Sequence, residues 1–178
     1  MLPEAVLTTY STKKPDAALF AETVGWADAI VCGPGLGTTE TAEWVVRHVL
    51  KCASVPVLFD ADALNVIARD VSILLRPHTE LVVTPHLGEM SRLSGDPVAY
   101  IQNHLIEVAK EFARQYNVIC VLKDEHTVTG VPYSQTWLNL SGCAGLATAG
   151  SGDVLSGVIG GLMAQGMAAE TAATVGVY

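Results

Sequence analysis

Short runs of apolar, mostly β-branched residues recur along the chain, separated by longer stretches that mix apolar and polar positions. Runs of this length and composition are typical of buried strands. They occupy residues 29–32, 57–60, 81–84 and 118–122. Residues 39–52 and 97–116 instead place apolar side chains at every third or fourth position, as one face of a helix does. Strands and helices that alternate in this order predict an α/β fold with a largely parallel sheet covered on both faces.

Two later segments add to this pattern. Residues 127–129 and 136–139 are short strand-like runs on either side of a turn that contains Pro132, which predicts a hairpin near one edge of the sheet. Residues 154–164 are apolar on all sides apart from Ser156, which predicts a buried central helix. Because this helix contains several glycines, which weaken helices, we expect close packing against a sheet or a ligand to compensate.

Composition and charge narrow the class of protein. The chain has 178 residues, 50% of them hydrophobic and 16% charged, which predicts one well-buried domain over residues 1–178. The net charge of -8 and the pI near 4.9 exclude nucleic acid and an anionic membrane as expected partners, since both attract basic surfaces. A phosphate ligand would therefore have to be held by local backbone amides and one or two cations.

The cysteines and the N-terminal residues indicate in which cellular compartment the protein is expected. Cys32, Cys52, Cys120 and Cys143 lack the C-x-x-C spacing of a metal or redox site. We expect free thiols in a reducing compartment, with Cys32 and Cys120 buried in strands. The first residues contain no basic region followed by an apolar core, so we expect no export signal and a cytoplasmic location.

Residues suited to chemistry follow directly after the predicted strands. A glycine-rich turn, G-P-G-L-G, occupies residues 33–37; Asp60 closes the second strand, His86 follows the third and Lys123 follows the fourth. In parallel sheets, ligands bind outside the carboxyl ends of the strands. We therefore expect these residues to share one rim of the sheet.

Each feature also has a simpler interpretation when taken alone. The G-P-G-L-G turn lacks the final glycine and the acidic residue of a dinucleotide-binding fingerprint, so it fits a tight turn as well. His86 fits a surface residue, and residues 123–127 fit a solvated hairpin turn. In D-A-D-A-L-N, metal ligation is less expected than a helix cap at Asp62 and a loop ordered by Asp60.

The run G-L-A-T-A-G-S-G-D-V-L-S-G at residues 145–157 is the most informative stretch. Gly150 and Gly152 allow backbone amides to approach a ligand closely, and the positive end of the following helix favours phosphate there. Asp153 would repel phosphate, unless it takes a proton from a hydroxyl that attacks that phosphate. The alternative is that Asp153 only caps the helix.

Taken in order, these segments resemble a known family. G-P-G-L-G, F-D-A-D-A-L-N, T-P-H-L-G-E, V-L-K-x-x-x-T and the long glycine-rich run are similar, in order and approximate spacing, to the ADP- or ATP-dependent NAD(P)H-hydrate dehydratases. These form a carbohydrate kinase-like domain family with a ribokinase-type fold. The resemblance extends from about Pro3 to Tyr178 and implies a three-layer α/β/α domain with a mostly parallel central sheet.

The resemblance assigns roles to individual residues. It implies that Asp153 is the catalytic base and contacts the substrate, that Gly37 and His86 bind the hydrated nicotinamide nucleotide, and that Gly152 contacts ADP or ATP. Further nucleotide-binding residues would be Lys123, Asp124, Glu125, His126 and Thr127. Glu89 corresponds more loosely to an acidic residue near Mg²⁺ in related kinases.

The implied reaction is cofactor repair by a hydro-lyase. Asp153 would deprotonate the ring hydroxyl of hydrated NADH or NADPH as this hydroxyl attacks the terminal phosphate of the nucleotide, and the ring would then expel phosphate. The expected partners are therefore small molecules, and the resemblance also suggests a homo-oligomer.

The chain departs from the family pattern in particular places. Asp124 stands where glycine is usual, and Cys143 where asparagine is common. The family domain usually has an earlier glycine-rich βαβ segment and continues past a helix like the last one here, so we expect an incomplete domain. Two other functions stay open: a hydroxymethylpyrimidine- or thiazole-type kinase of the same fold, and a non-catalytic nucleotide-binding or assembly module.

Overall fold

A six-stranded sheet forms the centre of the molecule, with the strands in the order β1-β2-β3-β4-β5-β6. The computed structural model describes residues 5–6, 8–9, 11, 15–75 and 79–178. Strands β1 to β4 pair in parallel, and β5 and β6 pair antiparallel beside β4. Their bounds are β1 Ile30–Cys32, β2 Val57–Phe59, β3 Leu81–Val83, β4 Ile119–Leu122, β5 Thr127–Gly130 and β6 Trp137–Asn139. The predicted strands and the predicted hairpin are confirmed.

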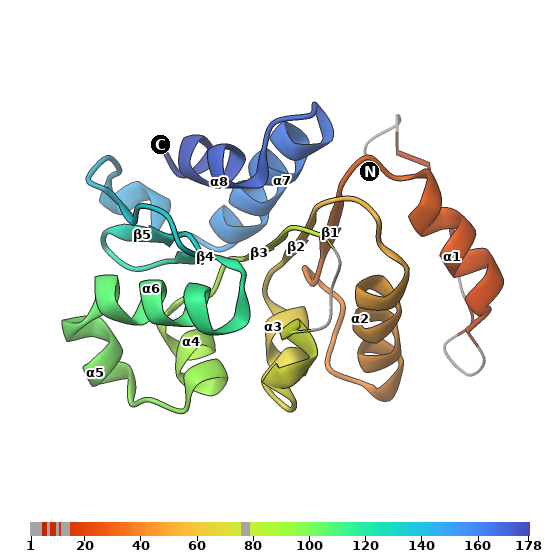
Figure 1. The fold of residues 1–178 in the computed structure, drawn as a ribbon, viewed down its shortest axis with the longest axis horizontal. Helices are drawn as coiled ribbons and strands as arrows, with labels where there is room; N and C mark the ends of the chain where they lie inside the picture. The colour runs from red at the N-terminus through yellow and green to blue at the C-terminus, as the bar shows by residue number, and fades with distance from the viewer. Residues whose placement is uncertain (1–4, 7, 10, 12–14, 76–78) are drawn as a thin grey trace.

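Helices cover both faces of this sheet (Figure 1). One face carries α2 Glu40–Cys52, α3 Asp62–Ile67, η1 Val71–Leu75, α4 Leu87–Ser94, α5 Val98–Asn103 and α6 Leu105–Tyr116. The other carries α7 Ser151–Ala164 and α8 Ala169–Val177. Helix α1 Ala17–Trp26 lies beside α2, and the short helix η2 Ala144–Leu146 precedes α7. The arrangement is the expected three-layer α/β/α fold.

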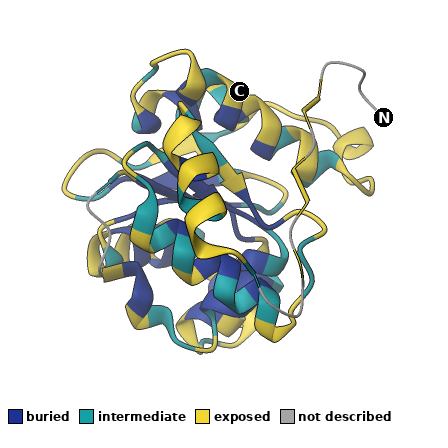
Figure 2. Cartoon of the chain, turned by 90° about the vertical axis from the view of Figure 1, so that its right-hand side faces the viewer, coloured by how far each residue is buried: buried dark blue, intermediate teal, exposed yellow. Residues whose placement is uncertain are grey.

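The strands alternate their side chains between two hydrophobic cores. On β2, Val57 and Phe59 face the core beneath α2 to α6, while Leu58 faces the core beneath α7 and α8. All three are fully buried, and Figure 2 shows the buried strands between helices whose outer faces are exposed. Both faces of the sheet are therefore covered, as the continuous apolar strand pattern predicts.

The register places the chemical groups on one rim. Cys32 pairs with Phe59, Phe59 with Val83 and Val83 with Cys120, so β1 to β4 end at nearly the same level. Because the strands are parallel, the segments that follow them emerge on the same side. This rim is where the candidate site is built.

The expected burial of Cys32 and Cys120 is also confirmed. All four cysteines are free, and Cys32 and Cys120 are buried. Burial raises the pKa of the Cys32 thiol to about 12, so this thiol stays protonated and acts as a small apolar side chain. Within the described part of the chain, no helix has the length and apolar character needed to cross a membrane.

The single helix expected at residues 97–116 is wrong, because the chain turns at His104. The backbone there leaves the helical region, with φ -136° and ψ 39°. Helix α5 packs against α4, whereas α6 packs over β4 and β5. Apolar periodicity is the same on both sides of the turn, so it does not reveal a change of direction.

The expectation of a fully buried helix at residues 154–164 is also wrong. Only one face of α7 is buried, including Ile159 and Met163, while Val154 and Val158 are 67% and 44% exposed. The sheet can cover only the side on which the helix rests. Composition alone does not distinguish a helix covered on one side from one covered all round.

Alanine substitutions at two neighbouring glycines test how α7 packs. A Cβ at Gly160 would collide with the Val31 side chain on β1, whereas nothing lies within 4 Å of the Cβ position at Gly161. We expect Gly160→Ala to lower the free energy of unfolding by about 1–2 kcal/mol. Gly161→Ala, at an exposed helical position, should raise it by about 0.5–1 kcal/mol. Chemical denaturation measures both, and equal effects would contradict the close packing of α7 on β1.

Candidate active site

The side chains of Asp60 and Lys123 form the centre of the rim. The Lys123 ammonium donates to Asp60 Oδ1 at 2.9 Å, although the two residues are 63 positions apart. The backbone N–H of Lys123 donates to the Pro85 carbonyl at 2.8 Å, which joins the ends of β3 and β4. The Asp60 side chain is 3% exposed and that of Lys123 is 20% exposed. The ion pair is therefore largely shielded from water, and Lys123 keeps only a small part of its surface free.

The second carboxylate oxygen of Asp60 binds helix α7. The Ser156 hydroxyl donates to Asp60 Oδ2 at 2.7 Å, and Ser156 is fully buried. Burial alone would raise the pKa of Asp60, yet the Lys123 charge and the hydroxyls of Ser156 and Thr84 hold this pKa below its usual value. Asp60 therefore stays ionised and connects two parts of the rim.

Helix α7 begins directly beside Lys123. Gly150, with φ +87°, precedes the first helical residue, and no side chain caps the helix. A Cβ on Gly152 would lie 3.4 Å from Lys123 Nζ, so the glycine leaves the first turn open next to the ammonium. Backbone N–H groups in the first turn of a helix have no partner within the helix. One cation and these amides can therefore act on the same anion.

Asp153 occupies the third position of α7 and is exposed. The interpretation of Asp153 as a helix cap is wrong, because Gly150 holds the cap position and no side-chain cap bond is present there. Asp153 and Ser156 are three positions apart, so they share one side of the helix. The Asp153 carboxylate lies in solvent near the open first turn, where a ligand can reach it.

His86 and Glu89 form a reciprocal capping box at the start of α4. The ring Nδ1 of His86 accepts from the backbone N–H groups of Gly88 and Glu89 at 3.0 and 3.3 Å, and the His86 N–H donates to Glu89 Oε2 at 2.9 Å. Because Nδ1 accepts two hydrogen bonds, the ring proton of the neutral side chain must reside on Nε2. The ring of His86 is half-exposed, and its Nε2 lies 3.5 Å from Glu89 Oε1.

Glu89 is buried, and its carboxylate is already in use. Burial raises the pKa of Glu89 above its usual value, more than the hydrogen bond from the His86 amide and the charge of Lys123 lower it. Among the described residues, no group of three or more His, Cys, Asp or Glu side chains could hold a metal ion. The direct role that the structure gives Glu89 is to orient His86 and α4.

Gly37 is held by the other carboxylate of the D-A-D turn. The Gly37 N–H donates to Asp62 Oδ2 at 2.8 Å, and the backbone φ of Gly37 is +75°. The expectation that Asp62 caps a helix is wrong, since Ala61 holds the cap position of α3 without a side-chain bond. Asp60 was expected to order the loop, but its side chain is instead buried against Lys123 and Ser156.

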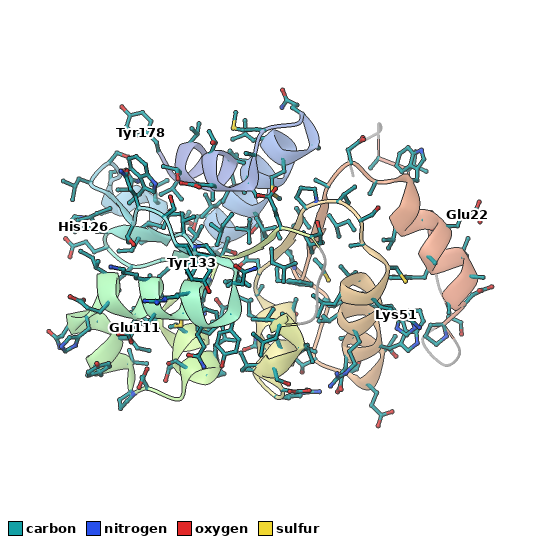
Figure 3. The ribbon with its side chains drawn as sticks, in the orientation of Figure 1. Glu22, Lys51, Glu111, His126, Tyr133 and Tyr178 are labelled. Atoms are coloured by element: carbon teal, nitrogen blue, oxygen red, sulfur yellow. The ribbon has the colours of Figure 1, made fainter. Side chains whose placement is uncertain are left out.

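Residues 123–127 do not all face the rim. Lys123 points into it, Asp124 is half-buried, and Glu125 and His126 are exposed at the turn between β4 and β5. Thr127 begins β5 and pairs with Asn139 on β6. Figure 3 labels His126 at the outer edge of the molecule. Only Lys123 is brought into side-chain contact with the other rim residues.

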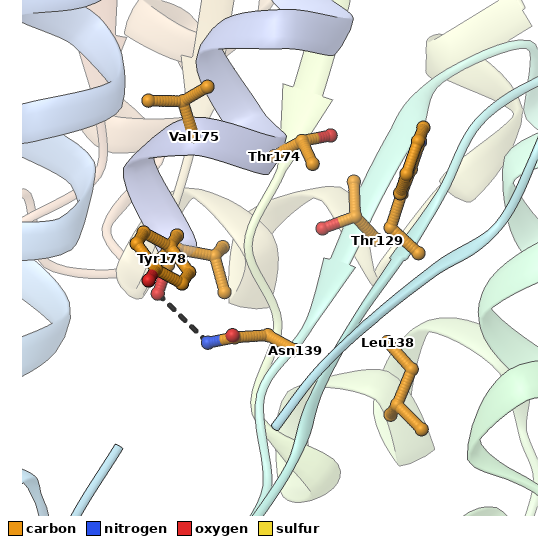
Figure 4. Close-up of a pocket in the computed structure, with 8 residues that line it drawn as sticks. Thr129, Leu138, Asn139, Thr174, Val175 and Tyr178 are labelled. Atoms are coloured by element: carbon orange, nitrogen blue, oxygen red, sulfur yellow. Dashed lines mark hydrogen bonds between the residues drawn. The ribbon is translucent and has the colours of Figure 1, made fainter. Parts of the chain in front are cut away.

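A hollow of about 340 Å³ lies between the β5–β6 hairpin and α8. Thr129, Trp137, Val175 and Tyr178 are among its mostly apolar lining, and the Asn139 amide donates to the Val177 carbonyl at 3.0 Å across it (Figure 4). Thr127 lies two residues before Thr129, so both face the same side of β5. The hollow thus adjoins one end of the turn that begins at Lys123.

Sequence reasoning missed Ser156 and the side-chain partners of Asp60. Ser156 is the one polar residue in an apolar helical segment, and this contrast was the available signal. Asp60 was noticed at a strand end, but its partners lie 63 and 96 positions away. No local pattern identifies contacts between positions so far apart.

The layers, the mixed sheet and the glycine-rich helix start define a ribokinase-like α/β protein. The chain belongs to the NAD(P)H-hydrate dehydratase family, whose model matches residues 1–178. The family resemblance inferred from the motifs is therefore confirmed.

Individual relatives agree with this assignment. A bifunctional NAD(P)H-hydrate repair enzyme of Moorella thermoacetica is 41% identical over 99% of this chain and 33% of its own length. The ADP-dependent (S)-NAD(P)H-hydrate dehydratase of Bacillus subtilis is 39% identical over 92% of this chain and 56% of its own length.

A solved structure supports the same fold. The Bacillus subtilis ADP/ATP-dependent NAD(P)H-hydrate dehydratase, co-crystallised with ATP and Mg²⁺ and soaked with CoA, superposes with a TM-score of 0.75 at 35% identity. The match covers 89% of this chain and 58% of that one. The chain thus spans between a third and three fifths of the length of these relatives.

Proposed function

We propose that this chain dehydrates hydrated NADH or NADPH in a nucleotide-dependent reaction, as a hydro-lyase that repairs the nicotinamide cofactor. The observation that carries the proposal is the open first turn of α7, where Lys123 Nζ lies 3.4 Å from the Cβ position of Gly152 and Asp153 is exposed. A phosphate group and a proton acceptor can meet at this point. The names of the relatives support the same reaction.

The nucleotide would bind with its terminal phosphate at α7. Lys123 and the first-turn amides supply positive charge, and the Thr127 hydroxyl offers a donor from the same turn. The apolar hollow beside β5, with Trp137 and Tyr178, is of a size and character suited to the base of ADP or ATP. Asp124, Glu125 and His126 would contribute through the backbone of their turn.

The hydrated nicotinamide would bind between Gly37, His86 and Asp153. The ring of His86 is half-exposed beside Glu89 Oε1, and its Nε2–H would turn from that carboxylate to a carbonyl or phosphate oxygen of this substrate. Gly37 would approach the substrate through its backbone, since it has no side chain. Asp153 would accept the proton of the ring hydroxyl.

The reaction would proceed in two steps. As Asp153 takes the proton, the hydroxyl oxygen forms a bond to the terminal phosphorus, and the bond from that phosphorus to the rest of the nucleotide breaks. The lone pair of the ring nitrogen then breaks the C–O bond and expels phosphate. Loss of a proton from the neighbouring ring carbon restores the reduced nicotinamide. Phosphorylation is needed because phosphate is a far better leaving group than hydroxide.

Magnesium fits this chain only as a companion of the nucleotide phosphates. Such an ion neutralises phosphate charge and is typically held by few protein ligands. Because the carboxylate of Glu89 already binds the His86 amide, we propose that Glu89 acts indirectly, by orienting α4.

One assay tests the proposal. The protein is incubated with hydrated NADPH and either ADP or ATP, and recovery of the absorbance of the reduced nicotinamide is followed together with phosphate release. We expect recovery that requires the nucleotide. A stable phosphorylated product would instead identify a small-molecule kinase, and nucleotide binding without either product would identify a non-catalytic module.

A further inference from the structure

The two carboxylates of the Asp60-Ala61-Asp62 turn contact different segments of the candidate site. Asp60 contacts Lys123 and Ser156, whereas Asp62 contacts Gly37. We infer that this turn is the positioning element of the site, with Asp60 orienting the nucleotide half and Asp62 the substrate half. The inference rests on the proposed function and adds two residues to which the reaction itself gives no role.

The Asp60 contacts connect the cation to the helix. Its Oδ1 accepts from Lys123 at 2.9 Å and its Oδ2 accepts from Ser156 at 2.7 Å. Ser156 lies one turn beyond Asp153 on α7. A lysine side chain is long and flexible, so a fixed partner greatly reduces the positions that its ammonium samples. Asp60 thus holds Lys123 against the first turn of α7 before a phosphate arrives.

The Asp62 contact holds the glycine turn in one conformation. Gly33, Gly35 and Gly37 all have positive φ, and such a segment loses much conformational entropy when it is ordered. The 2.8 Å hydrogen bond from the Gly37 N–H to Asp62 reaches across 25 positions of the chain. Asp62 therefore fixes the backbone that would face the hydrated nicotinamide.

The backbone of Ala61 allows the two carboxylates to diverge. Its φ of +48° and ψ of -120° are unusual for a residue with a side chain. Conformations of this kind are strained and concentrate at functional sites. The two contacts use different residues and different partners, so each can be removed without removing the other.

The inference is tested by comparing the KM for the nucleotide with the KM for the hydrate in variants of each aspartate. Asp60→Asn should raise the KM for the nucleotide roughly tenfold, about the effect of one lost charge-assisted hydrogen bond, with little change in the KM for the hydrate. Asp62→Ala, which removes the acceptor for the Gly37 N–H, should raise the KM for the hydrate and leave that for the nucleotide nearly unchanged. Residues that serve only the fold would change both constants together, and that result would overturn the inference.

A second set of variants tests whether Asp60 and Ser156 act through Lys123. Ser156→Ala should weaken nucleotide binding in the native background and have no further effect in a Lys123→Met background. Additive effects would contradict the inference. Ser72→Ala is the matched control, because it removes a serine hydroxyl that donates at 2.6 Å to the exposed Asp70, and it should change neither constant.

Calorimetric affinities for ATP and for hydrated NADPH separate this inference from the proposed function. A protein that binds both ligands without turnover would contradict the proposed function, yet the same partition between the Asp60 and Asp62 variants would uphold the inference. A folded protein that binds neither ligand would overturn both. Circular dichroism and thermal unfolding verify that each variant is folded.

Discussion

Asp153→Asn is expected to lower the rate of hydrate repair by about 10²–10⁴-fold, the usual contribution of a general base. The amide keeps the shape of the carboxylate but cannot accept the proton of the hydroxyl. Because Asp153 is exposed and makes no capping bond, the fold and the first turn of α7 should be unchanged. Single-turnover measurements at saturating nucleotide and hydrate determine the loss of rate.

Binding and stability measurements sharpen this prediction. Both ligands should bind Asp153→Asn with nearly native affinity, or more tightly in the case of the nucleotide, since a negative charge near phosphate is removed. The loss of an acidic group from the N-terminal turn should cost only about 0.3–1 kcal/mol of stability. Glu40→Gln removes an exposed acid from the first turn of α2 and is the matched control. A fully active Asp153→Asn would refute the assigned role.

Lys123→Met is expected to produce the largest loss of stability, about 3 kcal/mol, because it leaves the buried Asp60 carboxylate without its cation. For a chain of this size the melting temperature should fall by roughly 10 °C. Asp60→Asn combined with Lys123→Met should recover much of this loss, since neither a charge nor its partner is then buried. Chemical denaturation of the single and double variants measures the recovery. Independent, additive losses would show that the two side chains do not depend on each other.

The pH dependence of stability is a second test of Lys123→Met, because the direction of the change with pH can be predicted. In the native protein the pKa of Asp60 is lowered, so its stabilising contribution is present at neutral pH and is lost only as the pH falls below about 4. Without Lys123, burial raises this pKa. The folded variant then binds a proton before the unfolded chain does, and its stability should increase as the pH falls through the raised pKa toward about 4.

The double variant isolates Asp60 in this experiment. Glu89 also has a raised pKa and feels the charge of Lys123, so it contributes a change of the same sign. Asp60→Asn with Lys123→Met retains Glu89 but not the Asp60 carboxyl. The difference between the two stability profiles is therefore the contribution of Asp60, and identical profiles would contradict a raised pKa in the single variant.

Local sequence patterns were sufficient to predict the layers of the fold and the position of the site. Each predicted strand overlaps an observed one, because a short apolar run can bury both faces only inside a covered sheet. Parallel strands of equal register end together, so the order of the motifs also predicted that Asp60, His86 and Lys123 would share a rim. The break at His104 was not predictable in this way, since both helices keep the same apolar spacing.

Residue types and their local order therefore specified the fold class, the family and the rim on which the chemistry is assembled. Only the folded chain decided the partners of each side chain: Asp60 with Lys123 and Ser156, and Asp62 with Gly37. It also decided that Asp153 is free rather than a cap and that α7 is covered on one side. The physical reason is that periodicity and backbone preference act over a few residues, whereas hydrogen bonds and burial depend on positions that become neighbours only in the complete sheet.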